Sequence, residues 1–399
     1  MTLKVNILVL NYNAKDLLQR FMPSILAASK KSRHSCKVTV LDNQSRDGSA
    51  EWVKEYFPEV ELILAAENKV LCSYNEALGR SSDDIAILLN NDMELDENFV
   101  DPLIEPFLQD KDVFFVATHG DRSIVRSRWG IWSAEIDYPN TDLLNSEPGP
   151  TFSAGVAAFD RKKFLELGGY DELYLPGRYE DVDLCFRGWK RGWKGVYAPD
   201  SRKSHLGGAS FDKAFDWKTT QAMVFRNSLL FMVKNITDAW VLTKFAFMLI
   251  LRLVSAVLLG KWFLLSGFFA AWKRFPQALE GRKKAHGQFL RKDKEIMSLV
   301  NGDFKRKKSV QRAKAFVDTL GKNPWLRTPF FWATFYNLRL LKPVEYLLLR
   351  ELMDCDSVLD LGCGRHSMVP ILPKKIRTVG VEFFGPHFHE AARSGRHTE

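Results

Sequence analysis

The sequence predicts an α/β fold built on a mostly parallel sheet. In the first hundred residues, short apolar runs alternate with segments of helical pattern at the spacing of βα units. Runs that are apolar throughout suit strands buried on both faces, as parallel strands usually are. From about residue 110 to 215 the pattern loosens into aromatic-rich strands, loops and short helices. The expected strands are 5–10, 38–41, 61–65 and 85–89, and the expected helices are roughly 14–29, 49–57 and 73–80.

Residues 239–272 are the most apolar part of the chain. Lys244, Arg252 and Lys261 interrupt them, so the longest charge-free run is eleven residues. A membrane-spanning helix needs about 20 apolar residues with few charges. Two short helices lying in the membrane interface, divided near Gly260, are therefore the favoured prediction. A true crossing or hairpin and a soluble packed helix pair are the alternatives.

The net charge of +9 is concentrated in one stretch. From Trp272 to Lys308 twelve Lys and Arg stand against four Asp and Glu, which gives +8 in 37 residues. Such a stretch can be a solvated face or a nucleic-acid patch. Its place directly behind an apolar, Trp- and Phe-rich segment instead favours an anionic membrane surface as partner, and no nucleic acid is expected.

The cysteines and the start of the chain bear on its compartment. Five cysteines are scattered along 399 residues, with no CxxC pair and an odd count. This argues against a disulfide framework or a zinc site and for a reducing compartment. The first residues run straight into a strand pattern and lack the features of a signal peptide.

The most informative stretch is 168–187, which reads GGYDELYLPGRYEDVDLCFR. Glu180, Asp181 and Asp183 crowd the point where a Pro- and Gly-containing loop turns into an apolar-periodic helix. Carboxylates in a first helical turn are favoured by the helix dipole, so an acidic helix start is one explanation. The other is an ionised Asp held at a loop–helix junction as a general base, which a sugar-transfer reaction needs.

Further polar signals share the first 235 residues with this loop. Asn11 and Asp42 follow the first two expected strands, and ligands of open α/β sheets lie beyond the carboxyl ends of strands. Asn91 and Asp92 follow a third strand, where a carboxylate beside amide oxygens can hold a divalent cation against a diphosphate. His205 could complete that site, because neutral imidazole suits Mn²⁺. Each signal alone is also explained by turn chemistry or by a packed histidine.

The motifs resemble, in order, those of the family 2 glycosyltransferases over residues 3–235. They read NYN, DNQSRDGS, ENKVLCSYNEAL, LLNND, SAGVAAFDR, GGYDE and YEDVDLCFR, with a late His. The similarity is greatest to the bacterial cell-surface polysaccharide branch, which includes rhamnosyltransferase-like enzymes. Arg226-Asn227, before LLFMVKN, also resembles the element that precedes membrane-associated helices in that branch.

This resemblance implies a fold, a reaction and a location. The fold would be the A-type glycosyltransferase fold, and the reaction would invert the anomeric carbon of a nucleotide-diphospho-sugar with the help of Mn²⁺ or Mg²⁺. The acceptor would be a lipid-linked or polymeric glycan of the cell envelope, such as an O-antigen or capsule. The protein would lie at the cytoplasmic face of the inner membrane, peripheral or in its plane.

The resemblance also implies a role for each motif residue. Asp181 would be the base that deprotonates the acceptor hydroxyl, and Asp92 and His205 would be metal ligands. The metal motif is NND rather than a two-carboxylate DxD, which makes the histidine more important, and the glycine usual after Asn68 in relatives is missing. The nucleotide-sugar would be bound by Asn11, Asp42, Asn68 and Asn91, and the acceptor site would be shaped by Glu180 and Asp183.

A second resemblance concerns the C-terminal end. Asp360, Gly362 and Gly364 in the run DLGCG, with Glu382 on the next expected strand, resemble the opening of an S-adenosylmethionine-dependent methyltransferase. Only 17 residues follow Glu382, so we expect an incomplete Rossmann-like fragment that binds S-adenosylmethionine only if completed.

Two other functions stay open. One is a methyltransferase of a glycan whose N-terminal part binds the acceptor, and the other is a non-catalytic glycan- or nucleotide-binding scaffold. The predicted domains are a catalytic domain (1–235), apolar and basic membrane-associated helices (236–308), a helical linker (309–355) and the methyltransferase-like fragment (356–399).

Overall fold

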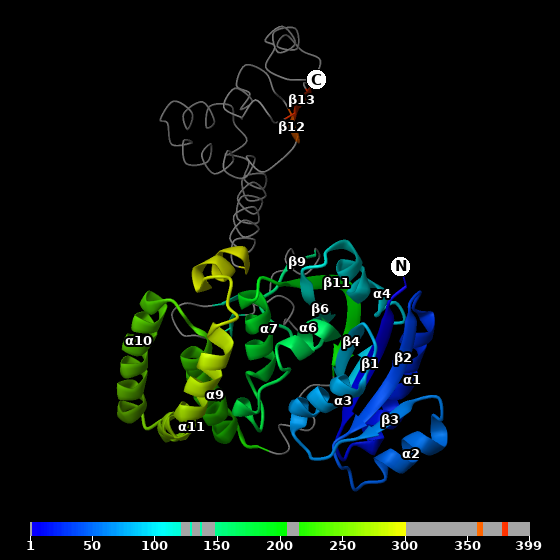
Figure 1. The fold of residues 1–399 in the computed structure, drawn as a ribbon, viewed down its shortest axis with the longest axis horizontal. Helices are drawn as coiled ribbons and strands as arrows, with labels where there is room; N and C mark the ends of the chain where they lie inside the picture. The colour runs from blue at the N-terminus through cyan, green and yellow to red at the C-terminus, as the bar shows by residue number, and fades with distance from the viewer. Residues whose placement is uncertain are drawn as a thin grey trace, which may run out of the picture. The chain divides into compact units, whose positions relative to one another are not determined.

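The chain forms two compact units, Met1–Lys307 and Lys308–Glu399. The computed structural model describes residues 2–120, 128–129, 136–137, 148–205, 215–300, 357–361 and 377–381. The first unit contains a mixed sheet with flanking helices and a group of long helices (Figure 1). The predicted boundary at 235/236 falls inside this unit.

The N-terminal half of the sheet is parallel. Its bounds are Lys4–Asn11 (β1), Ser35–Asp42 (β2), Glu61–Leu64 (β3) and Ile85–Asn90 (β4). Strand β1 lies between β2 and β4, and β3 pairs with the outer edge of β2. The intervening helices are Lys15–Lys31 (α1), Ser49–Tyr56 (α2) and Tyr74–Arg80 (α3). The four strands and three helices predicted here are confirmed.

The other half of the sheet mixes directions. Its strands are Met93–Leu95 (β5), Val113–Gly120 (β6), Gly149–Pro150 (β9), Ala157–Asp160 (β10) and Lys194–His205 (β11). Strand β10 runs antiparallel to β4 and β6, whereas β11 is parallel to β6 and antiparallel to β5 and β9. A separate antiparallel pair joins β7 (Arg128–Trp129) and β8 (Ile136–Asp137). The sheet therefore contains both parallel and antiparallel strand pairs, and the fold is α/β.

Each face of the sheet has its own hydrophobic core, because successive side chains of a strand point to opposite faces. Val5, Ile7 and Val9 of β1 pack in one core with Leu18 of α1. Leu8 belongs to the other core, which includes the aromatic side chains around α7 (Glu180–Lys190). The remaining helices over the sheet are α4 (Asp101–Gln109) and α6 (Arg161–Glu166).

Three long helices complete the first unit. They are Trp217–Asn235 (α9), Ala239–Leu258 (α10) and Trp262–His286 (α11). Helices α9 and α11 run in the same direction, because Trp217 packs on Phe263 near their starts, with ring centroids 5.3 Å apart. Near their ends Arg282 donates to the carbonyl oxygens of Val233 and Ile236, each at 2.7 Å. Helix α10 returns the chain from one end of this pair to the other.

The predicted break at Gly260 is confirmed. Gly260 has φ +63°, a left-handed conformation that glycine adopts readily, and it separates α10 from α11. The prediction of short helices was wrong, since these two contain 20 and 25 residues. By length and composition, α10 is apolar enough to cross a membrane, and among the described residues it is the one helix that is.

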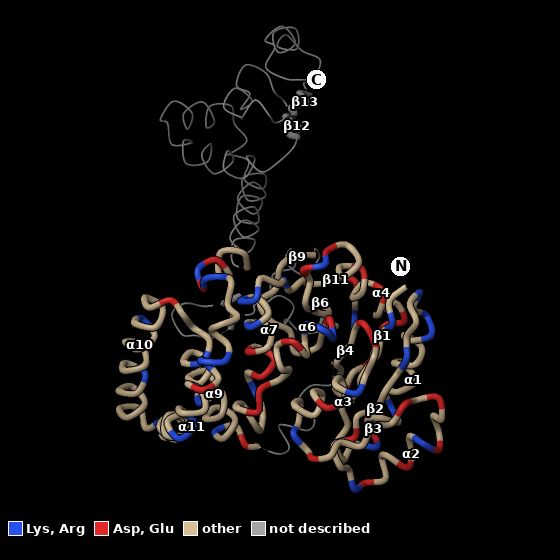
Figure 2. Tube along the Cα trace, in the orientation of Figure 1, with Lys and Arg blue, Asp and Glu red and all other residues tan. Residues whose placement is uncertain are grey.

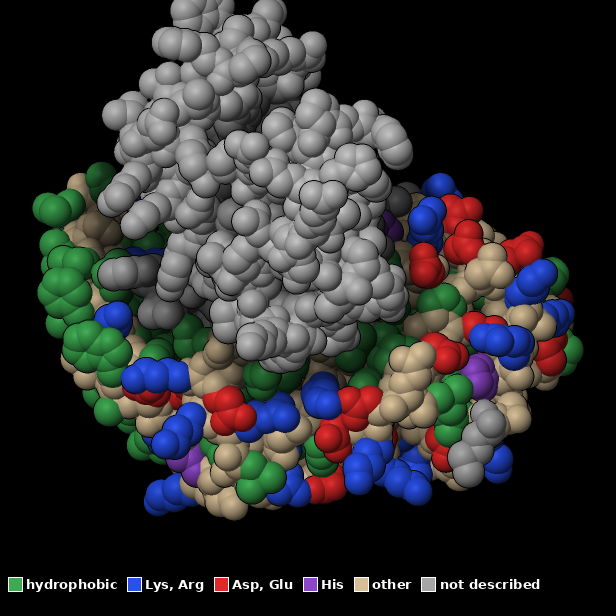
Figure 3. Space-filling view, turned by 90° about the horizontal axis from the view of Figure 1, so that it is seen from above, with side chains coloured by type: hydrophobic (Ala, Val, Ile, Leu, Met, Phe, Trp, Pro, Cys, Tyr) green, Lys and Arg blue, Asp and Glu red, His purple; other side chains and the backbone are tan. Residues whose placement is uncertain are grey.

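Helix α10 leaves most of its surface exposed. Only 11% of its most apolar 18-residue stretch is buried. Figure 2 shows the helix with few charged positions, and these are basic. Figure 3 shows hydrophobic side chains gathered at the side of the molecule where α10 lies. The large exposed apolar residues of α10 are Trp240, Phe247, Ile250, Leu251, Val254, Val257 and Leu258.

The described part of the second unit is a parallel pair of strands. Strand β12 (Ser357–Leu361) pairs with β13 (Arg377–Val381), which places Asp360 opposite Gly380. The strand expected after the DLGCG run is present as β13. Gly362, Gly364, Glu382 and the helical linker predicted at 309–355 lie outside the described residues, so the methyltransferase-like fragment stays a prediction.

Substituting Gly188 in α7 should destabilise the first unit. A Cβ atom there would lie 2.3 Å from Cδ1 of Phe114, which is fully buried. We expect Gly188→Ala to lower the free energy of unfolding by about 1–3 kcal/mol in a urea titration, as overpacking does. The matched control is Gly79→Ala in α3, where the new methyl group meets nothing within 4 Å. Equal stability of the two variants would contradict this packing.

Candidate active site

Three of the predicted donor-site residues meet at the carboxyl edge of the parallel strands. Asn11 and Asp42 are paired in register on β1 and β2. The Asn11 amide donates to Asp42 Oδ2 at 3.0 Å and to Ser45 Oγ at 3.2 Å, and Asn91 donates to Asn11 Oδ1 at 2.8 Å. The backbone N–H of Ser45 donates to the other Asp42 oxygen at 2.8 Å. The strand ends therefore form one buried polar network.

Asn43 was not singled out from the sequence, yet it carries an available acceptor in this network. Asp42 is 1% exposed and both its oxygens already accept hydrogen bonds. Asn43 is equally buried, and its Oδ1 accepts no hydrogen bond in this structure. Its Nδ2 donates to the carbonyl oxygen of Val70 at 3.2 Å. A buried acceptor without a donor is costly, and a ligand N–H would satisfy it.

Asn68 stabilises the loop that borders this network. Its Oδ1 accepts the backbone N–H of Val70 at 3.1 Å. Val70 has φ +51°, a left-handed conformation that is rare for a β-branched residue. Strain of this kind costs about 1–3 kcal/mol and often occurs where a ligand is held. Asn68 and Asn43 together hold this strained turn against the carboxyl end of β2.

The two predicted metal ligands come from distant parts of the sequence. Asp92 is 6% exposed and lies between β4 and β5. In the antiparallel pair of β11 and β5, the backbone of His205 lies opposite Met93, the residue after Asp92. Only the backbone of His205 is described, and within the described residues no group of three or more His, Cys, Asp and Glu could hold a metal ion. One carboxylate and one imidazole fit Mn²⁺ only with further oxygen ligands, such as those of a diphosphate.

The loop before α7 has an unusual backbone. Arg178 and Tyr179 have φ +74° and +81°, although neither is glycine, and they immediately precede Glu180. Two consecutive non-glycine residues in the left-handed region are strained, and such strain persists only where the surroundings impose it. The surroundings that impose it come from α9 and α11.

Asn227 of α9 fixes the carbonyl groups of this loop. Its Nδ2 lies 3.0 Å from the carbonyl oxygen of Tyr174, 2.8 Å from that of Gly177 and 2.6 Å from that of Arg178. Asn227 is fully buried. The amide therefore holds the chain at the strained residue that leads into α7.

Two guanidinium groups hold the earlier part of the same loop. Arg226 of α9 donates to the carbonyl oxygen of Leu175 at 2.8 Å, and Arg274 of α11 donates to the same oxygen at 2.9 Å. The sequence indicated Arg226-Asn227 only as an element before membrane helices, and it gave no signal for Arg274. Both long helices thus position the acidic loop directly.

Asp183 lies beneath the loop and connects α7 to α9. It accepts hydrogen bonds from Tyr174, Arg187, Lys234 and Asn235 at 2.7–2.8 Å and is fully buried. The nearby Lys234 and Arg187 charges hold the pKa of its carboxyl well below the usual range, against the effect of burial. These contacts hold the loop from within, and the part of Asp183 in shaping the acceptor site stays a prediction.

Glu180 and Asp181 are adjacent at the start of α7, and Glu180 is the more deeply buried of the two. Glu180 is 6% exposed and its Oε2 accepts no hydrogen bond, whereas Asp181 is partly exposed and accepts the N–H of Val182 at 2.8 Å. Burial, with the adjacent Asp181 charge, raises the pKa of Glu180 to about 8. Burial also raises the pKa of Asp181. A partly exposed carboxylate of raised pKa is a stronger base than a free one.

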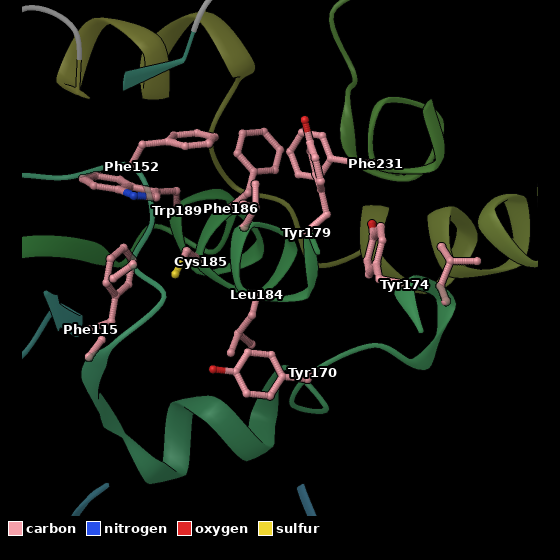
Figure 4. Packing of buried hydrophobic residues seen from close by; sticks show 14 of the residues in the cluster. Phe115, Phe152, Tyr170, Tyr174, Tyr179, Leu184, Cys185, Phe186, Trp189 and Phe231 are labelled. Carbon is pink, nitrogen blue, oxygen red and sulfur yellow. The ribbon is translucent and has the colours of Figure 1, made fainter. Parts of the chain in front are cut away.

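Aromatic packing holds α7 in place behind these carboxylates. Figure 4 shows Phe186 of α7 between Phe152 and Phe231 of α9, with ring centroids 5.8 and 5.3 Å apart. Tyr179 also packs on Phe231, at 5.9 Å. Gly155 lies beside the acidic pair, because a Cβ built there would be in ordinary van der Waals contact with Asp181 Oδ2, at 3.5 Å.

Residues 6–168 match the model of the family described as Glycosyl transferase family 2. The matched stretch contains the whole polar network at the strand ends and stops where the acidic loop begins. Over this stretch the chain is similar to the family 2 glycosyltransferases.

Several curated relatives are similar over half of the chain. N-acetylgalactosaminyltransferase 7 of Drosophila melanogaster is 24% identical over 227 residues, which cover 50% of this chain and 38% of the relative. Polypeptide N-acetylgalactosaminyltransferase 10 of Homo sapiens is 25% identical over 247 residues, which cover 56% and 39%. The chain thus spans about two fifths of the length of these relatives.

Solved structures with a limited likeness include two glycosyltransferase complexes. One is GalNAc-T7 with UDP, GalNAc and Mn²⁺, 18% identical, with a TM-score of 0.44 over 51% of this chain and 43% of that one. The other is the mannosyltransferase PcManGT from Pyrobaculum calidifontis in complex with GDP-Man and Mn²⁺, 17% identical, with a TM-score of 0.44 over 71% and 86%.

The acidic pair should make stability depend on pH. The pKa of Glu180 is about 8 in the folded protein and 4.5 ordinarily, so the folded state holds an extra proton between these values. Stability from this group is complete below pH 4.5 and is lost as the pH rises to 8, by at most about 1.4 kcal/mol per pH unit. We expect Glu180→Gln, which is neutral at every pH, to escape this loss, so that its unfolding free energy exceeds that of the native protein by a margin that grows from pH 5 to 8 in urea titrations.

The control for this titration is Glu172→Gln, an exposed carboxylate of the same loop. Its difference from the native protein should stay nearly constant over the same pH range. Parallel curves for Glu180→Gln as well would show that Glu180 is not held protonated.

Proposed function

We propose that the protein transfers a sugar from a nucleotide-diphosphate donor to a hydroxyl group of a cell-envelope glycan, with inversion at the anomeric carbon. The observation that carries the proposal is Asp181, a partly exposed carboxylate of raised pKa at the end of a strained, rigidly held loop. It lies in the same unit as the buried polar network of a family 2 domain.

Asp181 acts as the general base in this proposal. A sugar hydroxyl is a poor nucleophile, so a carboxylate must take its proton while the oxygen attacks the anomeric carbon. The bond from that carbon to the diphosphate oxygen breaks as the new bond forms. A single displacement without a protein nucleophile inverts the anomeric carbon, whereas retention needs two displacements.

The strand-end network receives the donor. Asn43 Oδ1 is the buried acceptor that a nucleoside N–H would satisfy. Asn11 and Asn91 fix the surrounding geometry through the hydrogen bond between them. Asp42 fixes the turn that begins at Ser45.

Asp92 and His205 are the residues that would hold a divalent cation. The cation, when bound, stabilises the negative charge that develops on the leaving diphosphate. The register of β11 on β5 brings the His205 backbone beside the Asp92 segment, which favours this pairing. The remaining ligands would come from the donor itself.

Replacing the base should separate binding from transfer. We expect Asp181→Asn to keep the donor affinity of the native protein and to lose transfer by about 10²–10⁴-fold, the usual contribution of a general base. Donor binding is measured by calorimetry across a panel of nucleotide sugars with Mn²⁺, and turnover by release of the nucleoside diphosphate. Glu172→Gln, on the same loop, should keep both properties. Unchanged turnover in Asp181→Asn would exclude this residue as the base.

We also propose that α10 rests on an anionic membrane surface, in its plane. Phe247, Ile250, Val254 and Leu258 are exposed and follow one helical stripe. The stretch from Trp272 to Lys308, which carries a charge of +8, begins within α11, the helix that follows α10. Apolar insertion together with basic side chains is the combination that holds an interfacial helix on anionic lipid. This location is consistent with a lipid-linked glycan acceptor.

Removing the apolar stripe should release the protein from lipid. Burying one Leu, Val, Ile or Phe side chain contributes about 1.5–3 kcal/mol. Replacing Phe247, Ile250, Val254 and Leu258 together with Gln should therefore lower co-sedimentation with phosphatidylglycerol vesicles by more than tenfold. Leu108→Gln, an exposed leucine in α4, is the control and should bind as the native protein does. Undiminished binding of the fourfold variant would place the anchor elsewhere.

A further inference from the structure

A largely apolar groove of about 360 Å³ lies between α9 and α10. A volume of this size is at the lower end of those that bind small molecules. Its wall on α9 is formed by Phe225 and Ser228. Its wall on α10 includes Phe245, Leu249, Arg252 and Ser255.

The groove exists because α10 stands apart from α9 while α11 does not. Helix α11 approaches α9 so closely that a Cβ on Gly267 would lie 2.6 Å from the carbonyl oxygen of Ala222. On α10, by contrast, Val241 and Ala256 are the buried residues. The side of α10 that faces α9 is thus left with space that no side chain of the described residues fills.

Arg252 gives the groove its charge. It is partly buried, and its guanidinium lies 4.8 Å from the ring centroid of Phe225. The surrounding helices add to this positive charge, because residues 217–279 contain eight Lys and Arg and one acidic residue, Asp238. An apolar groove with an arginine in its wall, in a strongly basic segment, is complementary to an anionic group attached to a hydrocarbon chain.

We propose that this groove binds the lipid end of the acceptor: a single long apolar chain joined to a phosphate. The inference rests on the proposed function and narrows its acceptor from a lipid-linked or polymeric glycan to a lipid-linked one. The exposed stripe of α10 continues from the groove wall, since Leu251 lines the groove and is 47% exposed. A chain could therefore enter the groove sideways from a membrane on which α10 rests.

Helix α9 therefore contacts both the groove and the loop that carries Asp181. Phe225 forms the groove wall, and the next two residues, Arg226 and Asn227, hold the carbonyl groups of the loop that carries Asp181. A lipid bound against Phe225 is thereby fixed relative to the base through less than one turn of α9. Positioning of this kind raises the rate by orienting the reacting hydroxyl.

The test uses farnesyl phosphate as the probe, with the full chain in detergent. We expect saturable binding by the native protein and at least tenfold weaker binding by Ser255→Phe, which fills the groove. Val257→Phe, on an exposed side of the same helix and outside both the groove and the apolar stripe, is the matched control and should bind as the native protein does. Arg252→Gln keeps the shape of the groove, so it should weaken farnesyl phosphate at least tenfold and leave farnesol unchanged, even if Ser255→Phe disturbs helix packing.

Several outcomes would overturn the proposal. Equal affinity of the native protein, Ser255→Phe and Arg252→Gln for farnesyl phosphate would place its binding elsewhere. Competition by phosphatidylglycerol vesicles at equal lipid phosphate would make the groove a general lipid contact. A dimer in sedimentation that Ser255→Phe dissolves would assign the groove to a second copy of the chain.

Donor hydrolysis by the native protein separates this inference from the proposed function. If the protein hydrolyses a nucleotide sugar but binds no farnesyl phosphate, lipid binding in the groove is refuted and the proposed transferase function is not. If the protein binds farnesyl phosphate through Arg252 but hydrolyses no nucleotide sugar, the proposed transferase function is refuted. The proposal that the groove binds the acceptor is then refuted as well.

Discussion

The buried carboxylate of Asp183 is the contact on which the acidic loop depends. A fully buried charge is stable only when partners compensate it, and here Lys234, Arg187, Tyr174 and Asn235 all donate to it. These partners come from the loop, from α7 and from the end of α9. The network therefore fixes the direction in which α7 leaves the loop, and with it the place of Asp181.

The long helices are part of the structure that holds the acidic loop. Asn227, Arg226 and Arg274 donate hydrogen bonds to carbonyl groups of the loop that leads into α7. Buried carbonyl groups need donors, and a loop with strained residues needs several of them. The helices that expose apolar surface thus also supply the rigidity of the acidic loop, which is why α9 to α11 and the sheet form one compact unit.

The sequence predicted the regular parts well, for a local reason. Short, mostly apolar runs marked β1 to β4, and polar residues at their ends marked the edge of the sheet where Asn11, Asp42 and Asn91 meet. The position of β10 between β4 and β6 could not be predicted in this way, because its antiparallel pairing depends on residues distant in sequence. The roles of Asn43, Asn227 and Arg274 were equally hidden: each depends on which backbone group lies opposite, and residue type does not encode that.

Arg178 and Tyr179 carry a consequence for how this sequence can change. Both hold left-handed backbone without being glycine, at a cost of about 1–3 kcal/mol each. Glycine at either position would relieve the strain but would also let the loop sample many conformations. Selection for thermal stability and selection for a fixed carboxylate therefore pull in opposite directions at these two positions. A more heat-resistant descendant of this chain would gain its stability elsewhere, in the sheet or the helix pair, and keep the strained turn.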